Sequence, residues 1–420
     1  MADVFGSEYE HRLRAVELVG AGVSKAETAR RVNRSREWVH KWLRRFEADG
    51  EAGLRDRSRA PKRHDQAMPH SVTSRVLEIR ADLEDDPVAN VGALSILATM
   101  ERRGSDPLPS ISTIERILRR AGKTRHVDSA ARSDIKLPLP AVTTPGVWQQ
   151  ADWIQDRYLK GGIRFQSLQI GDVGSHGITS GQYLDRRILT AVGFLIEKAW
   201  PKLSIPLAIG TDNAFVGTTH RDNPFTAWTR ACLFFGVEVI IAPPGVHGWT
   251  NHIEAVNHLW QQRTIWSQHF NNLEELRVGS NRACWWFNHR RPVLNPQECG
   301  TRYPAELIAA HRDQLRWPPD MTIADHLNHK QQLTVPLAAG RVTYLRHVTA
   351  ERTISLARTN WAVPRSVPVG GLVTATITTG NKTLTIGHQG QPAVTYNYPI
   401  NQPVTNGYYP PAEHSLLHHV

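Results

Sequence analysis

The order of apolar segments between residues 147 and 244 is the feature that most constrains the fold of this chain. It predicts three strands, then a helix, a strand, a helix and a strand, before a loop rich in glycine and proline leads into a long helix. Such an order is typical of an α/β sheet with helices packed on its faces. The segments are 147–158, 165–184 (two strands), 185–200, 205–215, 226–236, 237–244 and 253–270.

Acidic residues lie at the ends of three of these segments. Asp152 lies in the first strand, Asp212 follows the fourth, and Glu254 begins the long helix. Each has an ordinary structural explanation, because Asp and Asn are common in turns and Glu stabilises a helix N-terminus. As an ordered set they favour a cluster of carboxylates instead.

Three short motifs carry a resemblance to a known family. "WQQAD" is similar to the Trp-Gln-x-Asp of the first strand, and "TDNAF" to the Asp-Asn-Gly-x-x-Phe after the fourth strand, of retroviral integrases and DDE transposases. "PPGVHGWTNHIEAVN" resembles the Pro-rich loop, Asn and Glu that open their long helix. The resemblance is in particular to the integrase-type transposases of bacterial insertion sequences. It implies a ribonuclease H-like core over 144–320, with Asp152, Asp212 and Glu254 as catalytic and metal-binding residues.

The motifs also depart from the family pattern. The first motif carries one extra residue, so Asp156 competes with Asp152 as the first acid. Ala214 stands where relatives carry glycine. The spacing from Asp212 to Glu254 is longer than usual in the family, and residues 216–224 are the expected insertion.

Phosphodiester cleavage and strand transfer require an oxygen nucleophile and stabilisation of charge on the attacking and leaving oxygens. Two Mg²⁺ or Mn²⁺ ions supply both, and such hard cations prefer carboxylate oxygen. We expect Asp152 to bridge two ions, Asp212 to hold one and Glu254 the other. On the same face of the long helix, the resemblance implies that Asn257, His258 and Gln261 touch the DNA end; an ordinary polar surface is the alternative.

The N-terminal third predicts two helical DNA-binding segments. Residues 1–52 resemble a helix-turn-helix, 53–70 a basic linker and 71–123 a second helix-turn-helix-like domain. For residues 1–52, the alternative is a small helical bundle with a solvated basic face. For residues 53–70, it is an ordinary solvated linker. The predicted DNA-binding residues are Arg36, His40, Lys41, Arg44, Arg55, Arg57, Arg59, Lys62, Arg63, Arg116, Arg119 and Arg120.

The remaining segments complete the expected organisation. Residues 124–143 read as a linker, and alternating apolar and polar residues over 335–400 predict a small β-barrel with a hairpin turn at "TGNKT". Residues 401–420 read as a flexible tail. In "CWWF", Trp285, Trp286 and Phe287 are expected to pack in the core, with base stacking as the alternative.

The net charge indicates the kind of binding partner, and the cysteine content indicates the cellular compartment. The net charge of +11 favours a polyanionic partner, with double-stranded DNA first. Three cysteines form neither a disulfide framework nor a Cys-x-x-Cys metal pair, and the sequence shows no signal peptide or long apolar run. We therefore expect a cytoplasmic, nucleoid-associated protein without a membrane segment.

The sequence thus predicts a DNA transposase that binds the ends of its own element, joins them to target DNA and assembles as a homo-oligomer on DNA. Two alternatives use the same features. One is a non-catalytic DNA-binding regulator or inactivated transposase relative, and the other is a metal-dependent nuclease without strand transfer.

Overall fold

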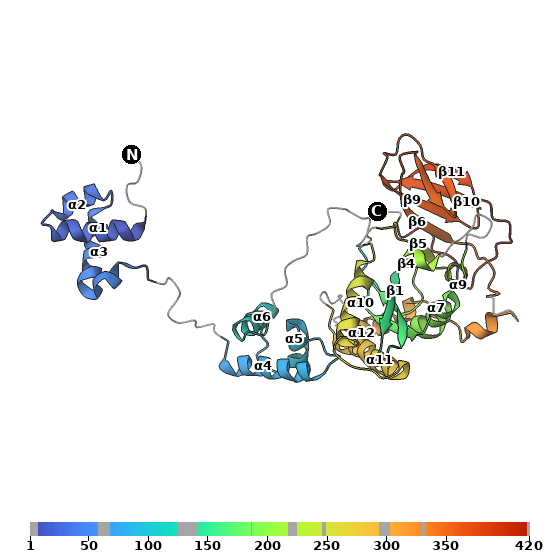
Figure 1. The fold of residues 1–420 in the computed structure, drawn as a ribbon, viewed down its shortest axis with the longest axis horizontal. Helices are drawn as coiled ribbons and strands as arrows, with labels where there is room; N and C mark the ends of the chain where they lie inside the picture. The colour runs from blue at the N-terminus through green and yellow to red at the C-terminus, as the bar shows by residue number, and fades with distance from the viewer. Residues whose placement is uncertain are drawn as a thin grey trace. The chain divides into compact units, whose positions relative to one another are not determined.

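The chain divides into two compact units, residues 1–68 and 69–420 (Figure 1). The computed structural model describes residues 7–57, 68–124, 141–185, 187–216, 225–245, 249–293, 303–328 and 333–417. The expected insertion at 216–224 and the linker at 124–143 fall largely outside these residues.

The first unit is a three-helix domain. It contains α1 (Glu8–Gly20), α2 (Lys25–Arg31), α3 (Arg36–Asp49) and a 3₁₀ helix, η1 (Gly50–Leu54). Ser24 and Ser35 cap α2 and α3, as predicted, because each hydroxyl accepts a hydrogen bond from a backbone N–H of the first turn. Val39, Trp42 and Leu43 of α3 are buried, so the opposite face of this helix carries its cations.

The second unit begins with three more helices, α4 (His70–Asp85), α5 (Ala93–Arg102) and α6 (Ile111–Arg120). Ser110 caps α6. Val88, just before α5, is buried in the same hydrophobic cluster as Ile253 and Trp260 of the core. These helices are therefore packed on the core within one unit.

A nine-stranded mixed sheet forms the centre of the second unit, in the order β11-β10-β9-β6-β5-β4-β1-β2-β3. Strands β1, β2 and β3 pair antiparallel, whereas β1, β4 and β5 are parallel. The order confirms the predicted α/β core. The first five strands are β1 (Trp148–Tyr158), β2 (Arg164–Asp172), β3 (Ile178–Tyr183), β4 (Ala208–Thr211) and β5 (Glu238–Ile241).

Helices cover both faces of this part of the sheet (Figure 1). One face packs on α7 (Ile188–Phe194), the π-helical turn η2 (Leu195–Ala199), α8 (Trp200–Leu203) and α9 (Ala227–Phe234). The other packs on α10 (Asn251–Arg263) and α11 (Leu273–Arg290), which α12 (Pro304–Ala310) follows. Short 3₁₀ helices lie at η3 (Asn213–Phe215), η4 (Arg312–Gln314) and η5 (Ile323–His326).

The strands predicted over 335–400 are present, and four of them continue the central sheet, while the small β-barrel itself stays a prediction. β6 (Arg341–His347) pairs in parallel with β5, and β9 (Leu372–Thr378), β10 (Thr383–His388) and β11 (Gln391–Asn397) continue the same sheet. β7 (Thr353–Leu356) and β8 (Thr359–Ala362) form a separate hairpin. The reason is that β5 is buried on both faces, and its free edge needs a partner strand.

The segment predicted as a flexible tail is instead packed on the core. The Ser415 hydroxyl donates to the buried Glu238 carboxylate at 2.7 Å, and Leu417 is buried beside Trp148. Buried carboxylates need hydrogen-bond donors, and the C-terminal segment supplies two of those that Glu238 uses. Among the described helices, none is long and apolar enough to cross a membrane.

We predict that Gly236→Ala loosens the C-terminal segment. Gly236 has φ +66°, and a Cβ there would overlap the Pro410 carbonyl and lie 2.8 Å from the Tyr409 oxygen. We expect the variant to lose about 1–3 kcal/mol of unfolding free energy beyond the cost of its backbone conformation. Denaturant unfolding, together with the rate at which chymotrypsin removes the C-terminal segment, measures this.

Gly370→Ala is the matched control. Gly370 has φ +76° but no atom within 4 Å of the added Cβ, so it carries the backbone cost alone. Equal losses in the two variants would show that the C-terminal segment is not held against Gly236.

Candidate active site

The pairing of β1 with β4 brings two of the predicted acids together. The strands are parallel, with Ala151 opposite Thr211 as the last pair. Asp152 and Asp212 are the next residues on each strand, so their backbones are neighbours at the carboxyl end of β4. In open α/β sheets this edge is where functional groups gather.

Helix α10 brings the third acid, Glu254, to the same edge. The Gln150 side chain ties the start of this helix to β1, since its oxygen accepts from the Ile253 N–H at 3.0 Å and its amide donates to the Trp249 carbonyl at 3.3 Å. Further along the helix, the Asn257 amide donates to the Asp152 carboxylate at 2.6 Å. Two polar side chains of β1, Gln150 and Asp152, thus fix the register of α10 against the sheet.

The charges of the three acids interact. Burial raises the pKa of Asp152 to about 6, and repulsion from Asp212 and, more weakly, Glu254 adds to the rise. Hydrogen bonds from the Trp153 N–H and the Asn257 amide oppose it. A carboxylate placed among like charges in a partly buried site gains most from a cation.

Each of these carboxylates also has a hydrogen-bond donor within the protein. Asp152 accepts from the Trp153 N–H at 2.8 Å, Asp212 from the Ala214 N–H at 2.8 Å, and Glu254 from the Thr250 hydroxyl at 3.0 Å. In the part of the chain that the structure describes, no three His, Cys, Asp or Glu side chains converge closely enough to hold a metal ion. As a donor set, three oxygen ligands with mutual repulsion suit Mg²⁺ or Mn²⁺.

The loop after β4 is held by residues distant in sequence. Asp212 caps the 3₁₀ helix Asn213–Phe215, so the turn explanation of this residue is also correct. The Asn213 amide donates to the Ala242 carbonyl at 3.2 Å, and its oxygen accepts from the Arg346 guanidinium at 2.9 Å. Ala214 lies within this right-handed helix, a conformation that does not require glycine.

Arg346 of β6 is a site residue that the sequence analysis missed. It joins the C-terminal strands to the loop that carries Asp212, and it also donates to the Ala242 carbonyl at 3.4 Å. No motif marks this residue. Only the pairing of β6 with β5 brings it to the site.

Asp156, the alternative first acid, lies elsewhere on β1. The pairing of β1 with β2 shifts register between Ile154 and Arg157, and Asp156 is exposed there. Its carboxylate accepts from the Gln166 amide at 2.6 Å and lies 3.5 Å from the Arg164 guanidinium. The register places Asp152, and not Asp156, beside Asp212.

The predicted DNA-contacting face of α10 is partly buried. Asn257 and Gln261 are 8% and 7% exposed, and Gln261 accepts from the Arg157 guanidinium at 3.0 Å. These side chains orient the site from within the protein, which argues against direct DNA contact. His258 alone of the three is exposed, with its ring beside that of Trp266.

Most predicted DNA-binding cations are exposed. His40 is half-buried, and Arg57 is paired with Asp49 at 2.6 Å. Arg59, Lys62 and Arg63 lie outside the described residues. The exposed ones are Arg36, Lys41, Arg44, Arg55, Arg57, Arg116, Arg119 and Arg120.

The aromatic run on α11 divides between core and surface. Trp286 and Phe287 are buried, as predicted, but Trp285 is 50% exposed. Its ring stacks on His289, and the Arg290 guanidinium lies 5.4 Å from the ring centroid. The prediction that all three pack in the core is wrong for Trp285, because the helical period turns this residue to the outer face.

Comparison with known proteins identifies the N-terminal helices. Residues 11–62 match the family described as helix-turn-helix domain, and residues 38–118 match the homeodomain-like domain. No curated protein matches the chain.

Among solved structures, the chain is similar to a simian T-cell lymphotropic virus intasome in complex with the PP2A regulatory subunit B56 gamma (14% identity, 73% of this chain and 96% of that chain, TM-score 0.33). It is also similar to the HTLV-2 integrase catalytic core domain in complex with magnesium (15%, 36% and 93%, 0.28) and to the BIV integrase catalytic core domain (13%, 40% and 97%, 0.30).

The chain therefore combines an N-terminal helix-turn-helix region with a mixed α/β core. Within this core the strand register makes Asp152 and Asp212 neighbours.

We predict that Asp152→Asn stabilises the metal-free protein. The folded state holds the Asp152 proton more tightly than the unfolded chain, with a pKa of about 6 against an ordinary value near 3.8. The free energy of unfolding therefore falls as pH rises from about 4 to about 6 and is level above that. We expect the variant to be about 1–3 kcal/mol more stable at pH 8, and the gap to be about 1 kcal/mol smaller at pH 5.

Denaturant unfolding at both pH values in the presence of a chelator measures the gap. Asp156→Asn is the control, because its exposed carboxylate is expected to show no such pH-dependent gain. A gap for Asp152→Asn that is equal at pH 5 and pH 8 would contradict the assigned burial and repulsion.

Proposed function

We propose that the protein is a DNA transposase that binds the ends of its element and catalyses metal-dependent cleavage and transfer of DNA strands. One observation carries the proposal: the β1–β4 register and the anchored α10 bring Asp152, Asp212 and Glu254 to one edge of the sheet. The exposed cations of the helix-turn-helix region support DNA as the substrate.

Asp152, Asp212 and Glu254 would hold Mg²⁺ or Mn²⁺ through their carboxylate oxygens. When bound, the ions supply a nucleophilic oxygen and neutralise charge on the leaving oxygen. Asn257 would keep the Asp152 carboxylate oriented through its 2.6 Å hydrogen bond. Arg346 and Asn213 would hold the Asp212 loop in place through the β6 contact.

The N-terminal helices would recognise the DNA. In a helix-turn-helix the last helix enters the major groove, which here is α3 with Arg36, Lys41 and Arg44 on its exposed face. α6 presents Arg116, Arg119 and Arg120 and would serve as a second reader. Work on two DNA ends would require a homo-oligomer assembled on DNA.

We expect Asp212→Asn to abolish catalysis and to spare DNA binding. The amide keeps the shape of the side chain but removes a charged metal ligand. We expect strand cleavage to fall at least about 100-fold, because metal ligation contributes several kcal/mol to transition-state stabilisation. The assay follows Mg²⁺- or Mn²⁺-dependent cleavage and joining of duplexes that carry the element ends, with binding measured separately.

Asp156→Asn is the matched control on β1 and is expected to remain active. Activity in Asp212→Asn would refute the assigned acids. Loss of activity in Asp156→Asn alone would show that Asp156, and not Asp152, is the first acid. A wild-type protein that binds the ends but never cuts them would identify a DNA-binding regulator, whereas cutting without joining would identify a nuclease.

Replacing Arg36 and Arg44 together by alanine is expected to weaken DNA binding. Each cation that neutralises a phosphate adds about one to the slope of log K against log[salt], so the slope should fall by about two. Arg14→Ala is the control, since Arg14 lies on α1 and pairs with Glu17. Fluorescence anisotropy over a salt series measures both, and an unchanged slope in the double variant would remove α3 from the interface.

A further inference from the structure

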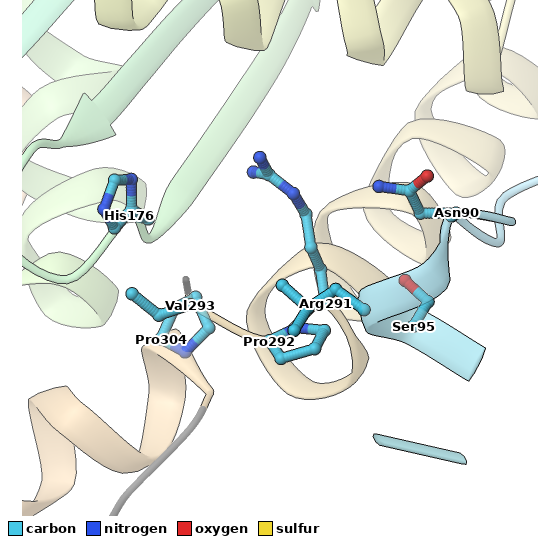
Figure 2. Close-up of a pocket in the computed structure, with 9 residues that line it drawn as sticks. Asn90, Ser95, His176, Arg291, Pro292, Val293 and Pro304 are labelled. Atoms are coloured by element: carbon cyan, nitrogen blue, oxygen red, sulfur yellow. The ribbon is translucent and has the colours of Figure 1, made fainter. Parts of the chain in front are cut away.

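A pocket of about 240 Å³ lies within the second unit, apart from the three acids (Figure 2). Four segments form its walls: the loop and first turn of α5, the turn between β2 and β3, the chain leaving α11, and the start of α12. The residues that matter are Asn90, Gly92, Ser95, His176, Arg291 and Pro304. No acidic residue is among those that line it.

Arg291 dominates the pocket. Figure 2 shows its guanidinium extending between Asn90 on one side and His176 on the other. It is half-buried, and desolvation lowers its pKa. Its side chain makes no hydrogen bond or ion pair with any residue that the structure describes. A guanidinium remains charged in proteins, and one that lines a pocket without an acidic partner favours an anionic ligand.

The first turn of α5 contributes further free donors. Gly92 is its N-cap and no side chain caps the helix, and Gly92, Leu94 and Ser95 of this end all line the pocket. Ser95 in this turn is only 3% exposed, and its hydroxyl has no hydrogen-bond partner among the described residues. A helix N-terminus with free donors favours an anion.

The pocket adjoins the start of α10. The His176 ring lies 5.3 Å from the ring of His252, between centroids. His252 is two residues before Glu254 and packs against Gly171 of β2, where an added Cβ would lie 3.2 Å from the imidazole. A ligand beside His176 would therefore lie close to the helix turn that carries the third acid.

We propose that this pocket binds a phosphate of the DNA backbone, held by the Arg291 guanidinium, the Ser95 hydroxyl and the N–H groups of the first turn of α5. The proposal rests on the proposed function, because it assigns a subsite for the same substrate. Guanidinium and helix N-terminus together match the charge and the acceptor oxygens of a phosphodiester. The volume exceeds that of one phosphate group, so the sugar on either side can enter as well.

The experiment uses the full-length chain with Asp212→Asn as background, so that binding is measured without cleavage. Duplexes carrying the element ends are made with one neutral methylphosphonate at a time, and their affinities are compared by anisotropy. Arg291→Gln is the test variant, and Arg290→Gln is the matched control, because its neighbouring guanidinium lies over Trp285 instead. Both variants remove one positive charge.

We expect Arg291→Gln to bind unmodified DNA about tenfold more weakly, as for the loss of charge-assisted hydrogen bonds, and Arg290→Gln to bind within about twofold of the background protein. One methylphosphonate position should weaken binding to the background protein and have no further effect in Arg291→Gln. The proposal would be overturned if every methylphosphonate weakened binding by the same factor in Arg291→Gln as in the background protein. It would also be overturned if Arg291→Gln and Arg290→Gln lost equal DNA affinity.

Two further measurements keep the result interpretable. Ser95→Ala should lose the same methylphosphonate effect in part, and it serves if Arg291→Gln does not fold. Thermal unfolding in inorganic phosphate, with sodium chloride at matched ionic strength, separates the sources of the anion: stabilisation abolished by Arg291→Gln, together with unchanged DNA affinity, would assign the pocket to free phosphate and overturn the proposal.

The same measurements distinguish failure of the proposed function from failure of the phosphate subsite. If the chain binds no DNA, both the proposed function and this subsite are lost. If it binds DNA through its helices but Arg291→Gln binds as the background protein does, only the subsite is lost. If the unmutated protein binds but does not cut, and the methylphosphonate effect is present, the subsite holds in a DNA-binding protein without catalysis.

Discussion

The parallel pairing of β1 with β4 is the constraint on which the rest of the site depends. A parallel pair ends its strands at the same edge of the sheet, so a fixed register decides which residues meet there. Ala151 opposite Thr211 makes Asp152 and Asp212 neighbours. A shift of one residue would turn one of the two acids to the other face of the sheet, and the charge cluster would be lost.

Buried polar side chains transmit this register to the other elements. Gln150 fixes the start of α10, and Asn257 returns from the helix to Asp152. On the opposite side, Arg346 reaches from β6 to Asn213. Buried polar groups are unfavourable unless they are satisfied, so each of these contacts favours one alignment of helix, strand and loop over its neighbours. The same reasoning makes Arg291 informative, because its half-buried guanidinium has no ion-pair partner among the described residues.

The C-terminal strands show where a local pattern misleads. Alternating residues over 335–400 correctly predicted strands, and "TGNKT" correctly predicted the turn between β9 and β10. Alternation cannot say which strand pairs with which, and a closed barrel and an extended sheet have the same pattern. In the structure, β6 pairs with the edge of β5 that would otherwise have no partner strand. The prediction of a flexible tail over 401–420 was wrong for a related reason. Ser415 donates a hydrogen bond to the buried Glu238, and the residues around Ser415 do not indicate this distant partner.

The sequence by itself determined the helix caps and the order of strands and helices, because these follow from local hydrogen bonding and from hydrophobic period, and its short motifs predicted the three acids. Only the tertiary structure placed Asp152, and not Asp156, beside Asp212, buried Asn257 and Gln261, exposed Trp285 and brought Arg346 to the loop after β4. Each of these depends on which surfaces meet across the sheet. Such contacts join residues far apart in the chain, and the physical cause is the burial and pairing of whole elements, which no short segment records.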